Sequence, residues 1–100
     1  MQLEELQQAR FTELLNSDFQ VFDDPATAFA VRLVEVNDRA TTPHQEVFTL
    51  LFHGPTKNFI GQGIHKLKHK DLGEIDIFLV PVGQDKDGFQ YEAIFNRLVS

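Results

Sequence analysis

The sequence predicts an α+β domain that is mostly antiparallel β, with an N-terminal helix followed by a six-stranded meander curled into a roll or partly closed barrel. Three observations predict this class. The first residues repeat their apolar side chains at the helical period, and from Phe19 onward the period becomes two. Turn residues recur at short intervals. The strand segments are apolar on both faces, so a flat sheet with one helix would leave one face uncovered.

The length and composition indicate one domain with a core of its own. The chain has 100 residues, of which 42% are hydrophobic and 24% charged, as in ordinary globular proteins. We expect a single domain over residues 1–100, with the N-terminal helix in 1–17 and the meander in 18–100. Ten phenylalanines and no tryptophan suit a tightly filled interior, and the absence of cysteine excludes disulfides and thiolate chemistry.

The helix is predicted over residues 2–15. Its apolar side chains fall near one stripe and its first turn carries two glutamates, which suit the positive end of the helix dipole. The polar triplet at 16–18 ends it. The apolar stripe comprises Leu3, Leu6, Phe11, Leu14 and Leu15.

Six strands are predicted, at residues 19–22, 28–36, 46–53, 63–69, 74–82 and 90–97. In four of them, alternate residues place large apolar side chains on one face, which we expect to form the core. These residues are Phe29, Val31 and Leu33; Phe48, Leu50 and Phe52; Ile75, Ile77 and Leu79; and Tyr91, Ala93 and Phe95. The opposite faces also hold apolar residues, among them Val34, Val36 and Phe78.

The turn between the fourth and fifth strands is predicted to be a bulged three-residue loop, 71–73, with Gly73 at positive φ. In that register Lys70 lies opposite Glu74, and Lys66 comes near Asp76. A two-residue loop would instead oppose apolar and charged side chains.

Charge and patterning exclude several functional classes. A formal net charge of −6 disfavours a nucleic-acid partner. The N-terminus lacks the cations and apolar run of a signal peptide, and no segment reaches the ~20 apolar residues of a membrane helix. We therefore expect a cytoplasmic protein with no membrane partner and no cofactor.

Four groupings could carry chemistry, and each has a structural alternative. His65 and His69 are spaced as zinc ligands would be on a helix, but in a strand roughly 13 Å separates them, so we expect solvent-facing or half-buried histidines and no metal site. Asp85, Asp87 and Gly88 resemble the start of a calcium loop without its bidentate glutamate. Turn chemistry, with positive φ, explains them better.

The other two groupings are a basic stripe and a glycine-rich segment. Lys66, Lys68 and Lys70 form a basic stripe, which is either a docking patch for an acidic partner or a solvated strand face that discourages edge pairing. Gly61 and Gly63 lack the Lys-Ser/Thr of a phosphate loop and indicate a bend or bulge.

A further set of residues carries a family resemblance. The set runs from Leu51-Phe52-His53-Gly54-Pro55, through Gln62-Gly63, Leu67, His69, Leu72-Gly73, Phe78 and Val80-Pro81-Val82-Gly83, to Asp85, Gly88 and Tyr91-Glu92-Ala93-Ile94-Phe95-Asn96. Over roughly residues 48–96 the chain resembles an uncharacterised family of small bacterial proteins, the domain of unknown function DUF6916. The resemblance implies no activity, cofactor or catalytic residue. It implies proximity to phage-tail-collar-like proteins and hence an accessory role in assembly.

Within that resemblance, His69, Glu92 and Asn96 could line a polar recess. Alternatively, Asn96 and Tyr91 could satisfy backbone groups at the ends of the sheet.

Three functions stay open. The first is a non-catalytic structural or interaction module that self-associates or binds a protein partner, for example in a phage-tail-like assembly. The second is a small-ligand-binding β-barrel, which requires a roomy apolar cavity. The third is an unrecognised enzyme, which requires a cleft with convergent titratable groups such as His65, His69 or Glu92.

Overall fold

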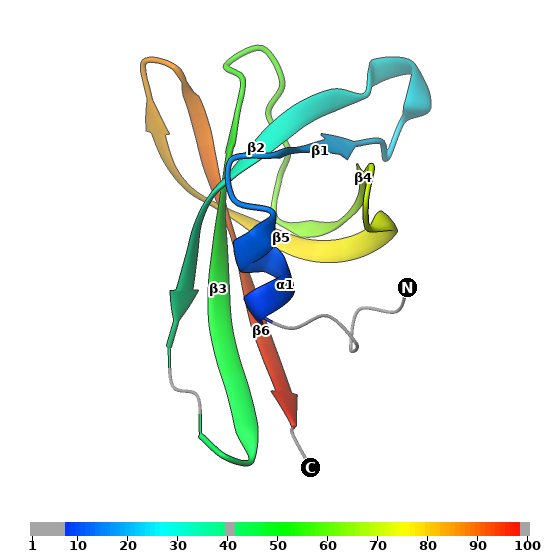
Figure 1. Ribbon diagram of the computed structural model, residues 1–100. Coiled ribbons are helices and arrows are strands. Elements are labelled where there is room, and N and C mark those ends of the chain that lie inside the picture. Colours follow the sequence, from blue (N-terminus) through cyan, green and yellow to red (C-terminus); the bar gives the residue numbers. More distant parts are fainter. Residues whose placement is uncertain (1–7, 40–41, 99–100) are drawn as a thin grey trace.

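Six antiparallel strands form a closed ring, and one short helix packs against it (Figure 1). The computed structural model describes residues 8–39 and 42–98. The strands are β1 (Asp18–Val21), β2 (Phe29–Asp38), β3 (Gln45–Gly54), β4 (Gly63–His69), β5 (Gly73–Asp85) and β6 (Gly88–Leu98), and a 3-10 turn, η2 (Pro25–Thr27), precedes β2. The predicted fold class and all six strands are confirmed.

Helix α1 (Gln8–Glu13) is shorter at its C-terminus than predicted, because a turn begins at Leu14. The predicted residues 2–7, with Leu3 and Leu6, lie outside the described residues. Phe11 is fully buried and lies with its ring centroid 6.0 Å from that of Phe48 and 5.3 Å from that of Phe95. The helix therefore packs on the inner side of the β3–β6 ribbon (Figure 1). Within the described residues, no helix has the length and apolar character that crossing a membrane requires.

The strand order around the ring is β1-β2-β3-β6-β5-β4, which differs from a simple meander at one step. After β3 the chain passes over residues 55–62 to β4, and β6 takes the place beside β3, in the manner of a Greek key. The ring is uneven. β3 and β6 pair along all of Gln45–Gly54, whereas β1 and β4 pair only at Gln20–Lys68 and Val21–Leu67. The β1–β4 seam is thus the short closure of the sheet.

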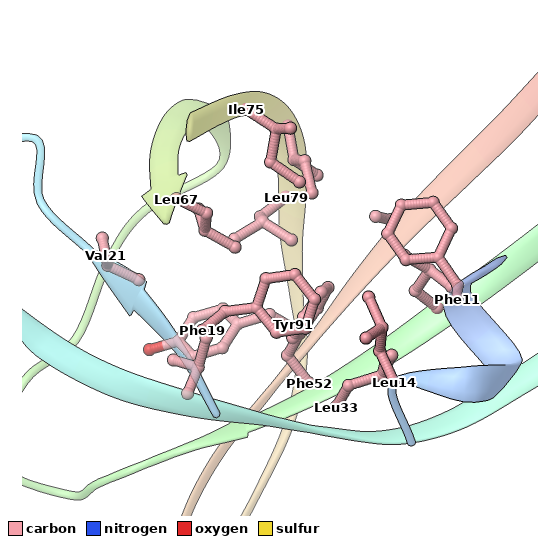
Figure 2. Close-up of a cluster of buried hydrophobic side chains, with 14 of the residues drawn as sticks. Phe11, Leu14, Phe19, Val21, Leu33, Phe52, Leu67, Ile75, Leu79 and Tyr91 are labelled. Atoms are coloured by element: carbon pink, nitrogen blue, oxygen red, sulfur yellow. The ribbon is translucent and has the colours of Figure 1, made fainter. Parts of the chain in front are cut away.

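The core faces are those that the alternation predicts. Large side chains from every strand fill the ring, and Figure 2 shows Phe19, Phe52 and Tyr91 meeting inside it. Phe19 and Phe52 pack edge to face, with centroids 5.3 Å apart. The interior is therefore occupied by side chains.

Two β-bulges change which face a residue occupies. In β2 the pairing with β3 shifts between Leu33 and Glu35, and in β5 the pairing with β6 shifts between Pro81 and Gly83. The extra residue at Val34 turns Val36 back toward the core, against which it packs, although strict alternation places it on the outer face.

The turn between β4 and β5 differs from the predicted register. Gly73 adopts φ 78°, the left-handed conformation expected for it. However, Gly73 pairs with His69, and Glu74 pairs with Lys68 instead of Lys70, so that Lys70 belongs to the loop. The expected approach of Lys66 to Asp76 is confirmed, since these two residues pair. The difference between the registers is two residues, which leaves every side chain on the face that alternation assigns to it.

Candidate functional sites

The predicted polar recess does not form. His69 follows Leu67 on the inner face of β4, whereas Glu92 and Asn96 point outward from β6, and β5 lies between these two strands. Asn96 accepts a hydrogen bond from the side-chain amide of Gln45, with Nε2 and Oδ1 2.6 Å apart. Glu92 lies 3.9 Å from Arg39. The prediction fails because the three residues belong to opposite faces of the sheet.

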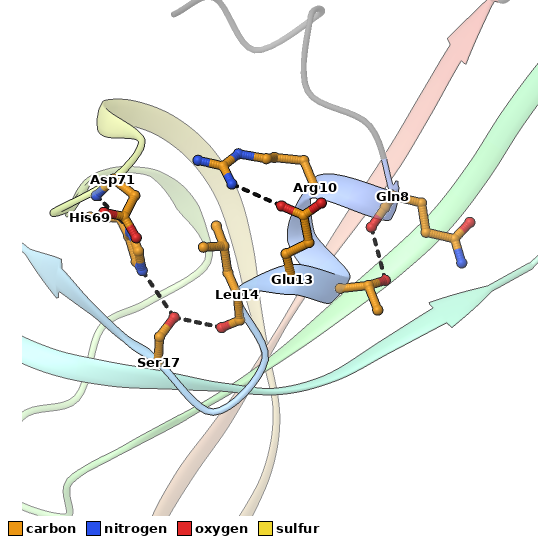
Figure 3. A network of polar contacts seen from close by, with 8 residues as sticks. Gln8, Arg10, Glu13, Leu14, Ser17, His69 and Asp71 are labelled. Atoms are coloured by element: carbon orange, nitrogen blue, oxygen red, sulfur yellow. Dashed lines mark hydrogen bonds and ion pairs between the residues drawn. The ribbon is translucent and has the colours of Figure 1, made fainter.

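His69 instead forms a buried polar contact with Ser17, where α1 leads into β1 (Figure 3). The residue is only 2% exposed, so the expected solvent-facing or half-buried position is wrong for His69. Its Nε2 lies 2.9 Å from Ser17 Oγ, and its Nδ1 accepts a hydrogen bond from the backbone N–H of Asp71 at 3.0 Å. The ring also packs on Phe19, with centroids 4.7 Å apart.

The hydrogen bonds fix the tautomer of His69. Because Nδ1 accepts the Asp71 N–H, the ring proton of the neutral imidazole is on Nε2 and is donated to Ser17. The Ser17 hydroxyl in turn donates to the carbonyl of Leu14, 2.5 Å away. A general base needs a free lone pair facing the hydroxyl, and this ring presents an N–H there. The pair therefore ties two segments together and does not activate Ser17 as a nucleophile.

The environment of His69 favours its neutral form. Burial lowers the pKa of the imidazole below its ordinary value, and the positive charges of Lys70 and Arg10 act in the same direction, against an opposing contribution from Asp71. A shallow hollow of about 430 Å³ opens beside it, lined by Asn16, Ser17, Asp18, Arg32, His69 and Lys70. Arg32 is paired there with Asp18 at 3.1 Å.

His65 lies at a different contact. Its Nδ1 is 2.5 Å from a carboxylate oxygen of Asp23, and its Nε2 is 2.6 Å from the carbonyl oxygen of Gly61. The partner of Nδ1 is therefore a carboxylate group and the partner of Nε2 is a backbone carbonyl. The imidazole thus joins the segment after β1, the β3–β4 loop and β4. Within the described chain, no three His, Asp or Glu side chains gather as a metal site would require.

Asp23 supports the same contact. Burial raises the pKa of its carboxyl, but the backbone N–H of Lys66, the hydrogen bond and charge of His65, and the charge of Lys66 outweigh this effect and lower the pKa below its usual value. The other carboxylate oxygen of Asp23 accepts the Lys66 N–H at 2.6 Å. Asp23 thereby fastens the chain just beyond the β1–β4 seam.

The basic stripe lies on the outer surface at β4. Lys66, Lys68 and Lys70 are all exposed, with Lys66 opposite Asp76 and Lys68 opposite Glu74 on β5. Among the described residues, none of the three ammonium groups closes an ion pair. The stripe is therefore one column of a two-column surface, with a carboxylate column beside it.

The Asp85 turn is built from hydrogen bonds, as expected, but without a positive φ at Gly88. Asp85 Oδ1 accepts the backbone N–H groups of Asp87 at 2.8 Å and Gly88 at 2.9 Å, and it lies 3.3 Å from His53 Nε2. The pKa of the Asp85 carboxyl lies below its usual value, chiefly because of the hydrogen bond from the Asp87 backbone N–H and next because of the hydrogen bond from the His53 side chain.

Gly88 is needed for space. A Cβ atom there would lie 1.8 Å from the carbonyl oxygen of Gly54, at the end of β3. His53 and Gly54 thus contact Asp85 and Gly88, and all four belong to the residues that carry the family resemblance. Their spacing in the sequence does not reveal this contact. This cluster fastens β3 to the β5–β6 turn.

Tyr91 satisfies backbone groups, in the β3–β4 loop, as the alternative interpretation expects of it. Asn96, which that interpretation also names, binds the side chain of Gln45 instead. The Tyr91 hydroxyl accepts the N–H of Ile60 at 3.2 Å and donates to the carbonyl of Asn58 at 3.4 Å. Burial raises the pKa of the phenol, against a smaller lowering by the Ile60 hydrogen bond. Tyr91 therefore anchors the β3–β4 loop on the core.

Comparison with known proteins identifies the family. No curated protein and no solved structure matches the chain. The family model described as "Domain of unknown function (DUF6916)" matches residues 6–95, which include α1 and nearly all of the ring. The chain therefore belongs to the DUF6916 family.

Proposed function

We propose that this protein is a non-catalytic interaction module that docks a protein through the outer face of its β4–β5 hairpin. The observation that carries the proposal is the pair Ile64 and Phe78, which lie directly opposite each other and are 71% and 50% exposed. Exposed apolar residues scattered singly are ordinary, whereas adjacent exposed apolar side chains are a reason to consider a contact surface.

The hairpin face consists of three cross-strand pairs that point outward: Ile64–Phe78, Lys66–Asp76 and Lys68–Glu74. Other exposed apolar side chains, such as Val82 and Ile94, have no directly opposed apolar partner of this kind: Ile94 pairs with Thr49, and Val82 lies at a bulge. The hairpin face therefore combines an apolar end with a charged end on one surface.

The interior gives no support to the other two functions. A ligand-binding barrel needs apolar space, but large side chains such as Phe19, Phe52 and Tyr91 are fully buried inside the ring. An enzyme needs convergent reactive groups, and the Ser17–His69 pair has the wrong tautomer for a nucleophile and its base. A cytoplasmic location and a phage-tail-like assembly stay predictions from the sequence.

Photo-crosslinking in the source cell tests the proposal. Benzoylphenylalanine replaces Phe78 in one variant and Phe59 in the control, because Phe59 is an aromatic residue of similar exposure (58%) whose ring packs on Phe89 of β6. We expect defined adducts from position 78 that disappear when Lys66→Glu and Lys68→Glu are added. Equal adducts from both positions, or none from position 78, would overturn the proposal.

A further inference from the structure

The hairpin face has a regular charge pattern. Along β4 the outward residues are Ile64, Lys66 and Lys68, and along β5 the residues opposite them are Phe78, Asp76 and Glu74. Two of the three rows across the hairpin therefore pair a cation with an anion, and the third row pairs two apolar side chains. The cations form one column and the anions the other.

This pattern is complementary to itself. Consider a two-fold axis that runs parallel to the strands, between β4 and β5, with two hairpin faces packed against each other. The rotation places β4 of each copy over β5 of the other and keeps every row at the same height. Each lysine then lies over a carboxylate, and Ile64 lies over Phe78. An isologous contact requires such a patch, in which the same surface serves both subunits.

The same pattern disfavours a uniformly charged partner. A purely acidic surface would satisfy the two lysines but would lie against Glu74 and Asp76, and like charges in contact are costly. A basic surface has the converse defect. A second copy of the chain offers both columns in the required arrangement, together with an apolar row at the same end.

We infer that the hairpin face binds the hairpin face of a second copy of this chain, in a two-fold dimer. The inference rests on the proposed function and names its partner. The six side chains of the hairpin face are fewer than the roughly 20–30 residues that each partner gives to a standard interface, so the dimer is weak and exchanges rapidly. Because two of its three rows are charged, the association weakens as salt concentration rises.

Sedimentation velocity over a range of protein concentrations at low salt is the test. We expect the weight-average sedimentation coefficient of the wild type to rise with concentration. The double variant Lys66→Glu/Lys68→Glu, in which the whole charged end is acidic, should stay monomeric. The control Lys57→Glu/Lys86→Glu makes the same change in net charge at exposed positions off the hairpin face, and should associate like the wild type.

A charge-swapped variant separates loss of association from loss of folding. This control is needed because two acidic columns side by side would repel each other and loosen the hairpin. The swap combines Lys66→Glu and Lys68→Glu with Glu74→Lys and Asp76→Lys, which keeps opposite charges across the strands. It should self-associate like the wild type. In a mixture it should not pair with fluorescently labelled wild type, because lysine would then lie over lysine.

Three outcomes would overturn the inference: a wild type that stays monomeric at every concentration, a double variant that associates like its control, or a swapped variant that pairs freely with the wild type. A monomeric wild type that still gives adducts with a different protein from position 78 would leave the proposed function standing and reject the second copy as the partner. Failure of the dimer inference can therefore be distinguished from failure of the proposed docking function.

Discussion

At the scale of single residues, His69 is the buried polar group whose position the sequence only partly indicates. Alternation places His65, Leu67 and His69 on one face of β4, so a buried imidazole was within reach of sequence reasoning. Its contact with Ser17 could not be predicted from the sequence, because closure of the ring at the β1–β4 seam brings the two residues together. The recess prediction failed for a different reason: it joined His69, on the inner face of β4, to Glu92 and Asn96, on the outer face of β6.

The buried His69 should make stability depend on pH. Because the pKa of the folded state lies below the unfolded value of about 6.5, the unfolded state binds more protons between the two values. The contribution of His69 to the free energy of unfolding is therefore fully present above pH ~6.5. It is lost as the pH falls from that value toward the lower pKa of the folded state. Urea denaturation at pH 7.5 and pH 5 should show this loss in the wild type.

The control is His69→Gln, which keeps a hydrogen-bonding side chain but removes the titration. We expect it to cost roughly 1–3 kcal/mol at pH 7.5, from lost packing on Phe19 and altered hydrogen bonds, and to show a smaller loss on acidification than the wild type. Equal losses in both proteins would mean that His69 does not contribute to the pH dependence.

At the scale of elements, period two was sufficient to place every strand, because each has one face in the core. Strand order was less accessible. Hairpin turns indicate neighbours along the chain, but the β3–β6 and β1–β4 pairings join segments with no shared turn. The bulges at Val34 and Val82 were also hidden, since one extra residue leaves no compositional trace.

The contact between Gly88 and Gly54 gives a prediction about the fastening of β3 to the β5–β6 turn. Gly88→Ala should destabilise the protein by about 3 kcal/mol or more, because the new Cβ atom meets a backbone oxygen that cannot move without breaking strand pairing. Gly61→Ala is the matched control, since nothing lies within 4 Å of its Cβ position. It should change stability by less than ~0.5 kcal/mol.

Thermal and urea unfolding of the two glycine variants measure the difference. If Gly88→Ala unfolds with the same midpoint as Gly61→Ala, the close approach at Gly54 does not constrain the fold. The expected positive φ at Gly88 was the wrong reason for this glycine; the right one, a backbone atom from a distant strand, is visible only once β3 and the β5–β6 turn are placed together.

At the scale of the whole molecule, the ring buries its large side chains and leaves an organised surface on the β4–β5 hairpin. The sequence indicates the basic stripe, but the acidic column beside it depends on register. The predicted register placed Lys70 opposite Glu74; the observed one pairs Lys68 with Glu74 and makes the rows of the hairpin face complete. The charge pattern of the hairpin face therefore follows from the turn geometry at residues 70–73.

The most direct test of a dimer through the hairpin face is a dilution series of amide ¹H–¹⁵N spectra at low salt. Protein concentrations from about 1 mM to about 20 μM suit a weak interface. We predict progressive shifts concentrated at the outward residues of β4 and β5, with α1 and the β3–β6 ribbon unchanged. Spectra that do not change with concentration, or shifts centred on another surface, would contradict the dimer through the hairpin face.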